Sequence, residues 1–246
     1  MTSTSKKTRN PDEILYFAYA SNMWSRRIHI CNPTAKFFDI GELEGYYIDF
    51  FDYFESWRGA SAALQKGPGR IAHGVVWTVP KEDIHNLDRQ ESDYEGVDVT
   101  VKLSSGEDAV CRTYVYGRTK AGKRDLPSLF YKAVIVAGAV EHQLPEAYVQ
   151  ELVKQPDNGN VQGVSVPLDV EELRSSVKGY LSLIERSRSL LPGLLSTMSG
   201  DSGAAGPRYV VRRGASGPVV TYRPFENAEH GLEPEFRLLG LADMKG

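Results

Sequence analysis

Residues 15–23 read Leu-Tyr-Phe-Ala-Tyr-Ala-Ser-Asn-Met, and the interpretation of the fold starts from this stretch. A run of apolar and aromatic residues, typical of a β-strand, stops abruptly at Ser21 and Asn22. A buried strand that opens into such a loop offers backbone N–H groups, a hydroxyl and an amide to a small ligand. The stretch therefore predicts a core strand whose end holds a polar metabolite.

The composition is that of an ordinary globular protein. The 246 residues allow one large domain, or one domain of about 150 residues with an appendage. The net charge of −3 gives no reason to expect a nucleic-acid or membrane partner. No segment approaches membrane-spanning length and no apolar leader is present, so we expect a cytoplasmic protein, either monomer or homodimer. Cys31 and Cys111 lack metal-ligand spacing and are expected to be buried free thiols.

Strand patterns fill the first half of the chain, and helical spacing follows them. The segment 37–54 is broken by Gly41 and Gly45 and is interpreted as two strands, while Gly67-Pro68-Gly69 is interpreted as the turn of a hairpin. The remaining predicted strands cover residues 14–19, 60–65, 71–79, 97–103, 109–116, 209–211 and 219–222. The predicted helices cover residues 24–31, 80–90, 129–142, 144–154 and 170–195.

Hairpins on both sides of one helix predict an α+β fold with an antiparallel or mixed sheet curled towards a barrel, packed helices and a C-terminal extension. The order of elements disfavours a doubly wound parallel sheet. Residues 1–12 are predicted to be a flexible tail and residues 13–155 the main domain. Residues 156–246 form the extension, with a helix, a Gly/Ser-rich linker and short strands. We expect its long helix to pack on the domain and to wall the ligand entrance.

Glu91 is the strongest candidate for a catalytic group. In the predicted helix 80–90 the apolar positions are Ile84 and Leu87, and Glu91 falls on the same face, seven and four residues later. Burial of a carboxylate raises its pKa towards neutral pH, as general acid–base catalysis requires. The alternative is that Glu91 lies past the helix end and faces water. Asp88, beside the stripe, and Glu95, in the predicted loop after the helix, are competing candidates.

Other catalytic arrangements have little support in the sequence. The five histidines form no H-x-x-x-H or H-E-x-x-H pattern, and there is no P-loop, G-x-G-x-x-G or G-x-S-x-G segment. We therefore expect no metal and no cofactor. Tyr131, on the first turn of the predicted helix 129–142, has no special claim on composition alone.

Several short segments in the same order resemble the gamma-glutamylcyclotransferase family over roughly residues 14–155. The loop Tyr16 to Met23 resembles that family's Tyr-Gly-Ser-Asn loop, and Leu87 to Glu91 resembles the segment that ends in its catalytic glutamate. Two positions depart from the family pattern, since Ala20 and Ser92 stand where glycine is usual. The other similar segments are Arg27-Ile28-His29, Asn32-Pro33, His73 to Trp77, Cys111 to Tyr114, Pro127 to Gly138 and Leu144 to Tyr148.

The resemblance implies an enzyme that releases 5-oxoproline from an L-gamma-glutamyl amide, a small-molecule substrate. The substrate's own α-amine attacks its γ-carbonyl, and Glu91 moves the proton as general base and then acid. The resemblance also implies a set of substrate-binding residues: Tyr16, Tyr19, Ala20, Ser21, Asn22 and Tyr131.

The length, the C-terminal third and the aromatic loop at residues 52–57 resemble a narrower branch, the cyclotransferases of fungal gliotoxin-type biosynthesis. That resemblance implies a glutathione conjugate of a dithiodiketopiperazine precursor as the substrate. Three alternatives stay open on the sequence: a gamma-glutamyl amide hydrolase, a gamma-glutamylamine cyclotransferase, and a non-catalytic binding module. Ala20 and Ser92 are the residues that favour the last of these.

Overall fold

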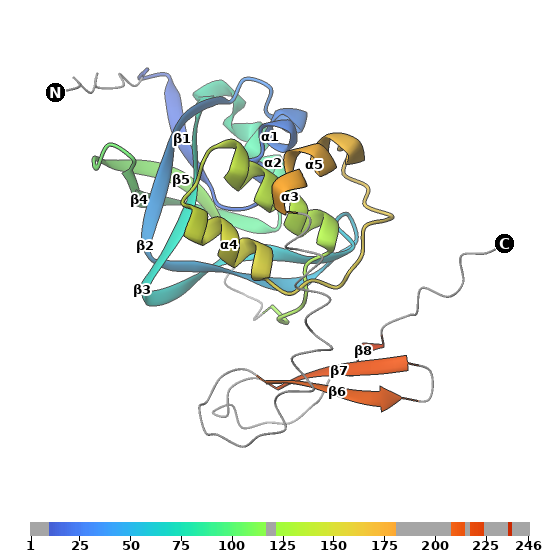
Figure 1. Cartoon of the computed structure of the whole chain (residues 1–246). Coiled ribbons are helices and arrows are strands. Elements are labelled where there is room, and N and C mark those ends of the chain that lie inside the picture. Colours follow the sequence, from blue (N-terminus) through green and yellow to red (C-terminus); the bar gives the residue numbers. More distant parts are fainter. Residues whose placement is uncertain (1–9, 117–121, 181–207, 215–216, 224–235, 238–246) are drawn as a thin grey trace. The chain divides into compact units, whose positions relative to one another are not determined.

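The computed structural model describes residues 10–116, 122–180, 208–214, 217–223 and 236–237 (Figure 1). The chain divides into two compact units, Met1–Glu185 and Arg186–Gly246, and each is considered by itself. Most of the predicted N-terminal tail and most of the predicted helix 170–195 lie outside the described residues. The predicted subdivision at residue 155 stays a prediction.

The first unit is built on a closed five-stranded barrel in the order β1-β3-β2-β4-β5. All neighbouring strands are antiparallel except β1 and β5, which are parallel and close the barrel at Tyr16 and Arg112. The predicted mixed sheet curled into a barrel is therefore confirmed. The strands are β1 (Glu13–Ala18), β2 (Lys36–Phe54), β3 (Gly59–Pro80), β4 (Tyr94–Leu103) and β5 (Asp108–Tyr116).

The long strands β2 and β3 correct the predicted strand pattern. Residues 37–54 form one strand where the sequence suggested two, and residues 60–79 form no hairpin, because they all lie in β3 and pair with β2. Residues 67–70 make a bulge opposite Gly45, and pairing continues on both sides of it. Gly45 and Gly69 have φ values of 79° and 75°, which glycine adopts without steric cost. The Gly-Pro-Gly signal thus bends the strand without reversing the chain.

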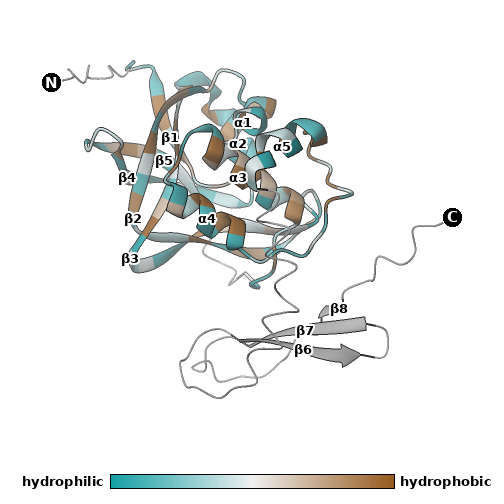
Figure 2. Ribbon diagram, viewed as in Figure 1, coloured by the Kyte–Doolittle hydropathy of each residue, from teal (hydrophilic) through white to brown (hydrophobic). Residues whose placement is uncertain are grey.

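Helices connect and cover the strands. The chain turns from β1 through the short helix η1 into α1, and from β3 through η2 into α2. Figure 2 shows polar and apolar residues alternating along α4, whose buried residues lie on one face. The helical bounds are η1 (Ser21–Met23), α1 (Ser25–Cys31), η2 (Lys81–Asp83), α2 (Ile84–Gln90), α3 (Leu129–Glu141), α4 (Glu146–Lys154) and α5 (Val170–Ser176).

Helix α3 is buried along most of its length, as its almost entirely apolar sequence predicts. Ser128 caps it by accepting a hydrogen bond from the backbone N–H of Tyr131. Gly138 lets α3 touch the turn at η1, because a Cβ at this position would lie 2.4 Å from the backbone nitrogen of Trp24. The loop after β1 is therefore supported from behind by the central helix.

Three details differ from the predictions or extend them. Strand β4 begins at Tyr94, so Glu95 lies in a strand and not in a loop. Cys31 is exposed, whereas Cys111 is buried as expected; both are free thiols. No helix in the described part of the chain is long and apolar enough to span a membrane.

The second unit contains a three-stranded sheet in the order β6-β7-β8. Its strands are β6 (Arg208–Gly214), β7 (Gly217–Arg223) and β8 (Phe236–Arg237), and all pairs are antiparallel. The predicted hairpin over residues 209–222 is confirmed by the pairing of β6 with β7.

Candidate active site

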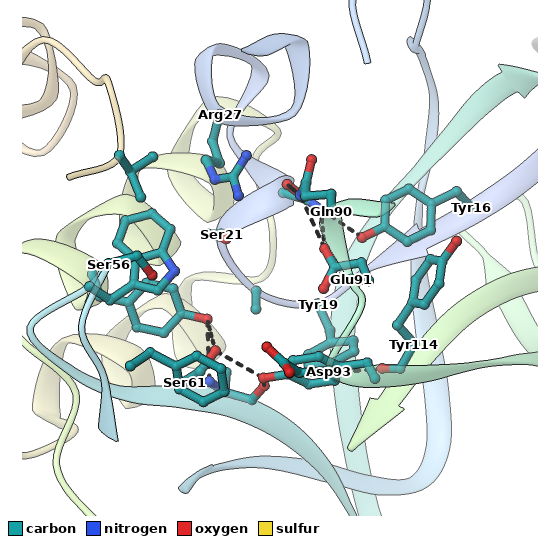
Figure 3. A pocket seen from close by; sticks show the side chains of 18 residues that line it. Tyr16, Tyr19, Ser21, Arg27, Ser56, Ser61, Gln90, Glu91, Asp93 and Tyr114 are labelled. Atoms are coloured by element: carbon teal, nitrogen blue, oxygen red, sulfur yellow. Dashed lines mark hydrogen bonds between the residues drawn. The ribbon is translucent and has the colours of Figure 1, made fainter. Parts of the chain in front are cut away.

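A cavity of about 230 Å³ opens between the loop after β1, the end of α2 and the tip of the β2–β3 pair (Figure 3). Strands β3, β4 and β5 and helix α3 contribute further side chains to its wall. All seven residues predicted for the site lie on this wall: Glu91, Tyr16, Tyr19, Ala20, Ser21, Asn22 and Tyr131. The fold thus brings together segments that are up to 115 positions apart, from Tyr16 to Tyr131.

Glu91 stands at the end of α2, where its backbone N–H still donates to the carbonyl of Leu87. Because Leu87 is fully buried, the last turn is held against the core and the Glu91 side chain is directed into the cavity (Figure 3). The side-chain amides of Asn22 and Gln90 donate to Oε1 of Glu91 at 2.9 and 3.1 Å. Oε2 has no hydrogen-bond partner within the described residues. Glu91 does lie past the helix end, but it faces a cavity lined by protein.

The pKa of Glu91 is raised above its usual value of 4.5, and removal from water is the largest cause. The positive charge of Arg27 and the hydrogen bonds from Gln90 and Asn22 act in the opposite direction, because they stabilise the carboxylate. The group therefore combines a raised pKa with donors that fix its position. That combination is what a proton-transferring carboxylate needs.

The loop after β1 forms the wall facing Glu91. Asn22 is buried; its amide nitrogen also donates to the Tyr16 hydroxyl, at 3.0 Å, and its amide oxygen accepts from Gln90 at 2.8 Å. Tyr19 is buried too, with its hydroxyl donating to the carbonyl of Tyr114 at 2.8 Å. Burial raises the pKa of both loop tyrosines, Tyr16 and Tyr19, so they stay neutral.

Ala20 precedes η1 and has a φ of −131°. This value is negative, so the left-handed conformation that would penalise alanine is not used here. The alanine at this position therefore carries no left-handed penalty.

The opposite wall is a cluster of hydroxyl groups around Tyr131. The Tyr131 hydroxyl accepts from the backbone N–H of Ala62 at 3.2 Å and lies 3.3 Å from the Ser61 hydroxyl. Tyr94, from β4, donates to the Ser61 hydroxyl at 2.9 Å. Burial raises the pKa values of Tyr131 and Tyr94, which keeps these hydroxyls protonated as donors.

A segment that follows the predicted main domain contributes to the cavity wall. Val166 lines the cavity, and the backbone N–H of Ser165 donates to the carbonyl of Ser56 at 3.1 Å. The Asn158 amide donates to the carbonyl of Arg58 at 2.9 Å. Residues 158–166 thus fasten the tip of the β2–β3 pair. Val166 lies four residues before α5, while the wall role expected of the helix 170–195 stays a prediction, because most of that helix lies outside the described residues.

The competing carboxylates do not share the geometry of Glu91. Asp88 is exposed and accepts hydrogen bonds from Tyr114 and Arg112, which lower its pKa, and it is not part of the cavity wall. Glu95 also lies off the wall, while Asp93 lines it from an exposed position. Within the described residues, no group of three or more His, Cys, Asp and Glu side chains is placed to hold a metal ion.

Sequence reasoning missed several cavity residues, because they come from segments with no signal of their own. Ser61 lies in a strand whose alternation predicts only a sheet face, and Tyr94 falls in the loop predicted between the helix 80–90 and the strand 97–103. Val166 lies outside the predicted main domain. Arg27 lies five residues after Asn22, within a predicted helix. A charged residue on the turn next to a ligand loop was the available signal.

Sequence comparison identifies relatives of this chain in mammals. It is 33% identical over 183 residues to the human protein named Gamma-glutamylcyclotransferase, covering 70% of this chain and 93% of that one. The chain belongs to the gamma-glutamylcyclotransferase family. A mouse protein of the same name is 36% identical over 149 residues, covering 57% of this chain and 78% of that one.

Family and fold comparisons agree with this membership in the gamma-glutamylcyclotransferase family. The model of the AIG2-like family matches residues 72–152, a span that holds Glu91 and Tyr131. A solved structure described as gamma-glutamyl cyclotransferase superposes with a TM-score of 0.60 at 31% identity, covering 68% of this chain and 99% of that one. The barrel with its helices is therefore the fold of this enzyme family.

Proposed function

We propose that this chain is a gamma-glutamyl cyclotransferase that releases 5-oxoproline from an L-gamma-glutamyl amide, with Glu91 as general base and then general acid. The observation that carries the proposal is the Glu91 carboxylate, directed into a cavity, fixed by two amide donors and raised in pKa by burial. Membership in the cyclotransferase family supports the same chemistry.

The proposed reaction is an intramolecular aminolysis that consumes no water. The α-amine of the glutamyl group is mostly protonated at neutral pH, so a base must take its proton before it attacks. The amine nitrogen then bonds to the γ-carbonyl carbon, the bond from that carbon to the leaving nitrogen breaks, and Glu91 returns the proton to the leaving nitrogen. The products are the five-membered lactam and a free amine.

The cavity walls support the other demands of this reaction. The glutamyl group must be held folded so that its amine meets its own carbonyl, a proximity effect worth several kcal/mol. The first N–H groups of a helical turn have no partner inside the turn, so the backbone at Ala20, Ser21 and Asn22 supplies donors for the carbonyl oxygen as it gains charge. Tyr16 and Tyr131 complete the glutamyl subsite as neutral donors. Tyr19, whose hydroxyl donates to the carbonyl of Tyr114, contributes to the wall of the subsite.

We further propose that the leaving group is bulky and derived from glutathione, as in gliotoxin-type secondary metabolism. The support for this is the apolar surface that Phe54 and Val166 contribute to the cavity wall. A thioether conjugate with an aromatic or heterocyclic substituent has apolar surface of its own to bury there.

The test measures 5-oxoproline and glutamate released from three substrates: glutathione, an S-benzyl-type glutathione conjugate and a gamma-glutamyl alkylamine. The wild-type protein is expected to release 5-oxoproline, fastest from the conjugate. Glu91→Gln keeps size and hydrogen-bonding capacity but removes the base, so turnover falls at least 1,000-fold while substrate binding by calorimetry persists. Glu82→Gln is the control, since it removes an exposed carboxylate from η2 away from the cavity.

Each alternative function has its own result in this experiment. Release of glutamate without 5-oxoproline identifies a hydrolase, and exclusive turnover of the alkylamine identifies a gamma-glutamylamine cyclotransferase. Binding without any turnover identifies a binding module. Undiminished turnover by Glu91→Gln contradicts the assignment of the base.

A further inference from the structure

Arg27 places a positive charge on the cavity wall. It lies in α1, and its guanidinium carbon is 5.6 Å from the centre of the Trp57 ring. Its Nε is buried without a hydrogen-bond partner, and no carboxylate within the described residues lies within ion-pair distance of it. A partly desolvated guanidinium with an unused donor is costly unless an anion occupies the space in front of it.

Arg27 and Glu91 belong to the same cavity but do not form an ion pair. Figure 3 shows the guanidinium and the carboxylate directed into the cavity from α1 and from the end of α2. They are close enough for the arginine charge to lower the pKa of Glu91. The two side chains therefore present a positive and a negative group to one ligand without neutralising each other directly.

An α-amino acid head matches this pair, because one carbon carries both an ammonium and a carboxylate. We propose that Arg27 binds the α-carboxylate of the gamma-glutamyl group while Glu91 faces the α-amine on the same carbon. This inference rests on the proposed function and names the part of the substrate that the site recognises. Tyr131 is less suited to this role, because its neutral hydroxyl already accepts from Ala62 and contacts Ser61.

We assign Arg27 to the α-carboxylate, and not to a carboxylate in the leaving group, because Arg27 shares the cavity wall with Glu91 and its charge acts on the Glu91 carboxylate. The leaving group lies beyond the scissile amide, on the far side of the glutamyl chain from the α-carbon. A guanidinium holds a carboxylate through two parallel N–H donors, which also fixes the rotation of the α-carbon. Arg27 thereby aims the amine at Glu91, so a lysine, with a single point charge, is expected to replace it incompletely.

The experiment varies the substrate and the arginine together. Two gamma-glutamyl alkylamides are compared, one with a free α-carboxylate and one with an α-carboxamide, alongside glutathione and its glycinamide analogue. For the wild type, kcat/KM is expected to be roughly 100-fold lower on the α-carboxamide, whereas amidation of the glycine has little effect. In Arg27→Gln the α-carboxylate preference collapses to a few-fold, and Arg27→Lys restores part of it.

Arg26→Gln is the matched control, because Arg26 lies next to Arg27 in α1 but is exposed and paired with Glu172. It should discriminate between the substrates as the wild type does. Equal discrimination by Arg27→Gln and the wild type overturns the inference, and so does a preference for the glycine carboxylate that is lost in Arg27→Gln.

Two further readouts separate this inference from the proposed function. If Arg27→Gln does not fold, the wild-type comparison of α-carboxylate with α-carboxamide decides by itself. Calorimetric binding of the two alkylamides to the wild type and to Arg27→Lys measures recognition without turnover. Normal release of 5-oxoproline without a preference for the α-carboxylate contradicts the role of Arg27 and leaves the cyclotransferase proposal unaffected. Absence of 5-oxoproline together with selective binding of the α-carboxylate contradicts only the cyclotransferase proposal.

Discussion

The side-chain amide of Asn22 donates to Oε1 of Glu91 at 2.9 Å, which joins the loop after β1 to the end of α2. The same nitrogen donates to Tyr16, and the Asn22 oxygen accepts from Gln90, so the amide is fully engaged in one orientation. The carboxylate is thus positioned by a residue 69 places earlier in the chain. A hydrogen bond to a charged group contributes about 1.5–3 kcal/mol, and here it stabilises the position of the Glu91 carboxylate.

Asn22→Asp is expected to move the acid limb of the kcat/KM profile to higher pH. The substitution keeps the shape of the side chain but places a second carboxylate beside Glu91, and a nearby like charge raises a carboxyl pKa further. The profile is measured with one substrate from pH 4 to pH 9. Asn86→Asp is the control, since it adds the same charge to α2 outside the cavity wall. An unchanged acid limb in Asn22→Asp would show that Glu91 does not control the rate.

Glu91→Gln is expected to raise the melting temperature at neutral pH. Because burial raises the Glu91 pKa above 4.5, the folded state binds this proton more tightly than the unfolded state. Stability then falls as pH rises from the unfolded pKa through the folded one, and the full penalty remains above it. Glu91→Gln avoids this penalty, so the difference in melting temperature between the variant and the wild type should shrink as the pH falls towards 4.5. Thermal unfolding at several pH values measures the difference, and a pH-independent gap would contradict the shift.

Lys132→Met is expected to lower the free energy of unfolding by about 3–5 kcal/mol. The ammonium of Lys132 is buried and donates to the carbonyls of Val153 and Gln155 and to the Asp157 carboxylate, at 3.2, 2.9 and 2.7 Å. Removing it takes the ammonium away from the buried Asp157 carboxylate and from two backbone carbonyls. Urea unfolding gives the value.

The double variant Lys132→Met/Asp157→Asn is the companion measurement. It is expected to recover part of the stability, because the buried negative charge is gone as well. A single variant as stable as the wild type would mean that the ion pair does not hold α3 to the segment after α4.

Ala20→Gly is expected to lower stability by roughly 0.5–1 kcal/mol without raising kcat. The φ of Ala20 is accessible to alanine, so glycine adds only freedom to the unfolded chain. Denaturant unfolding and steady-state kinetics check the two parts. A stabilised variant would show that the alanine is strained in a way that its φ value does not reveal.

Local patterns predicted most elements of the barrel but not the pairing of its longest strands. Alternation and turn residues were enough for β4 and β5, which meet across a short turn. The Gly67-Pro68-Gly69 signal was ambiguous, because a bulge and a chain reversal require the same backbone freedom. The presence of β2 as a continuous partner decides between them, and that information lies outside the segment itself.

The site was predictable to the extent that its chemistry is local. Glu91 follows from an apolar stripe that ends in a carboxylate, and the loop at residues 20–22 follows from polar residues after a buried strand. Val166 reaches the cavity only because the chain returns to it after α4, and nothing in its spacing separates it from an ordinary surface residue. Arg27 is close to the ligand loop in sequence, but the helical pattern does not show that its side chain meets the cavity.

The tip of the β2–β3 pair is fastened by chain that arrives about a hundred positions later, through Asn158 and Ser165. The carboxylate and its amide donors come from different segments, the loop after β1 and the end of α2. On the proposed function, a duplicated gene whose changes are confined to residues 156–169 is expected to alter the cavity wall at Val166 while the proton-transfer groups stay unchanged.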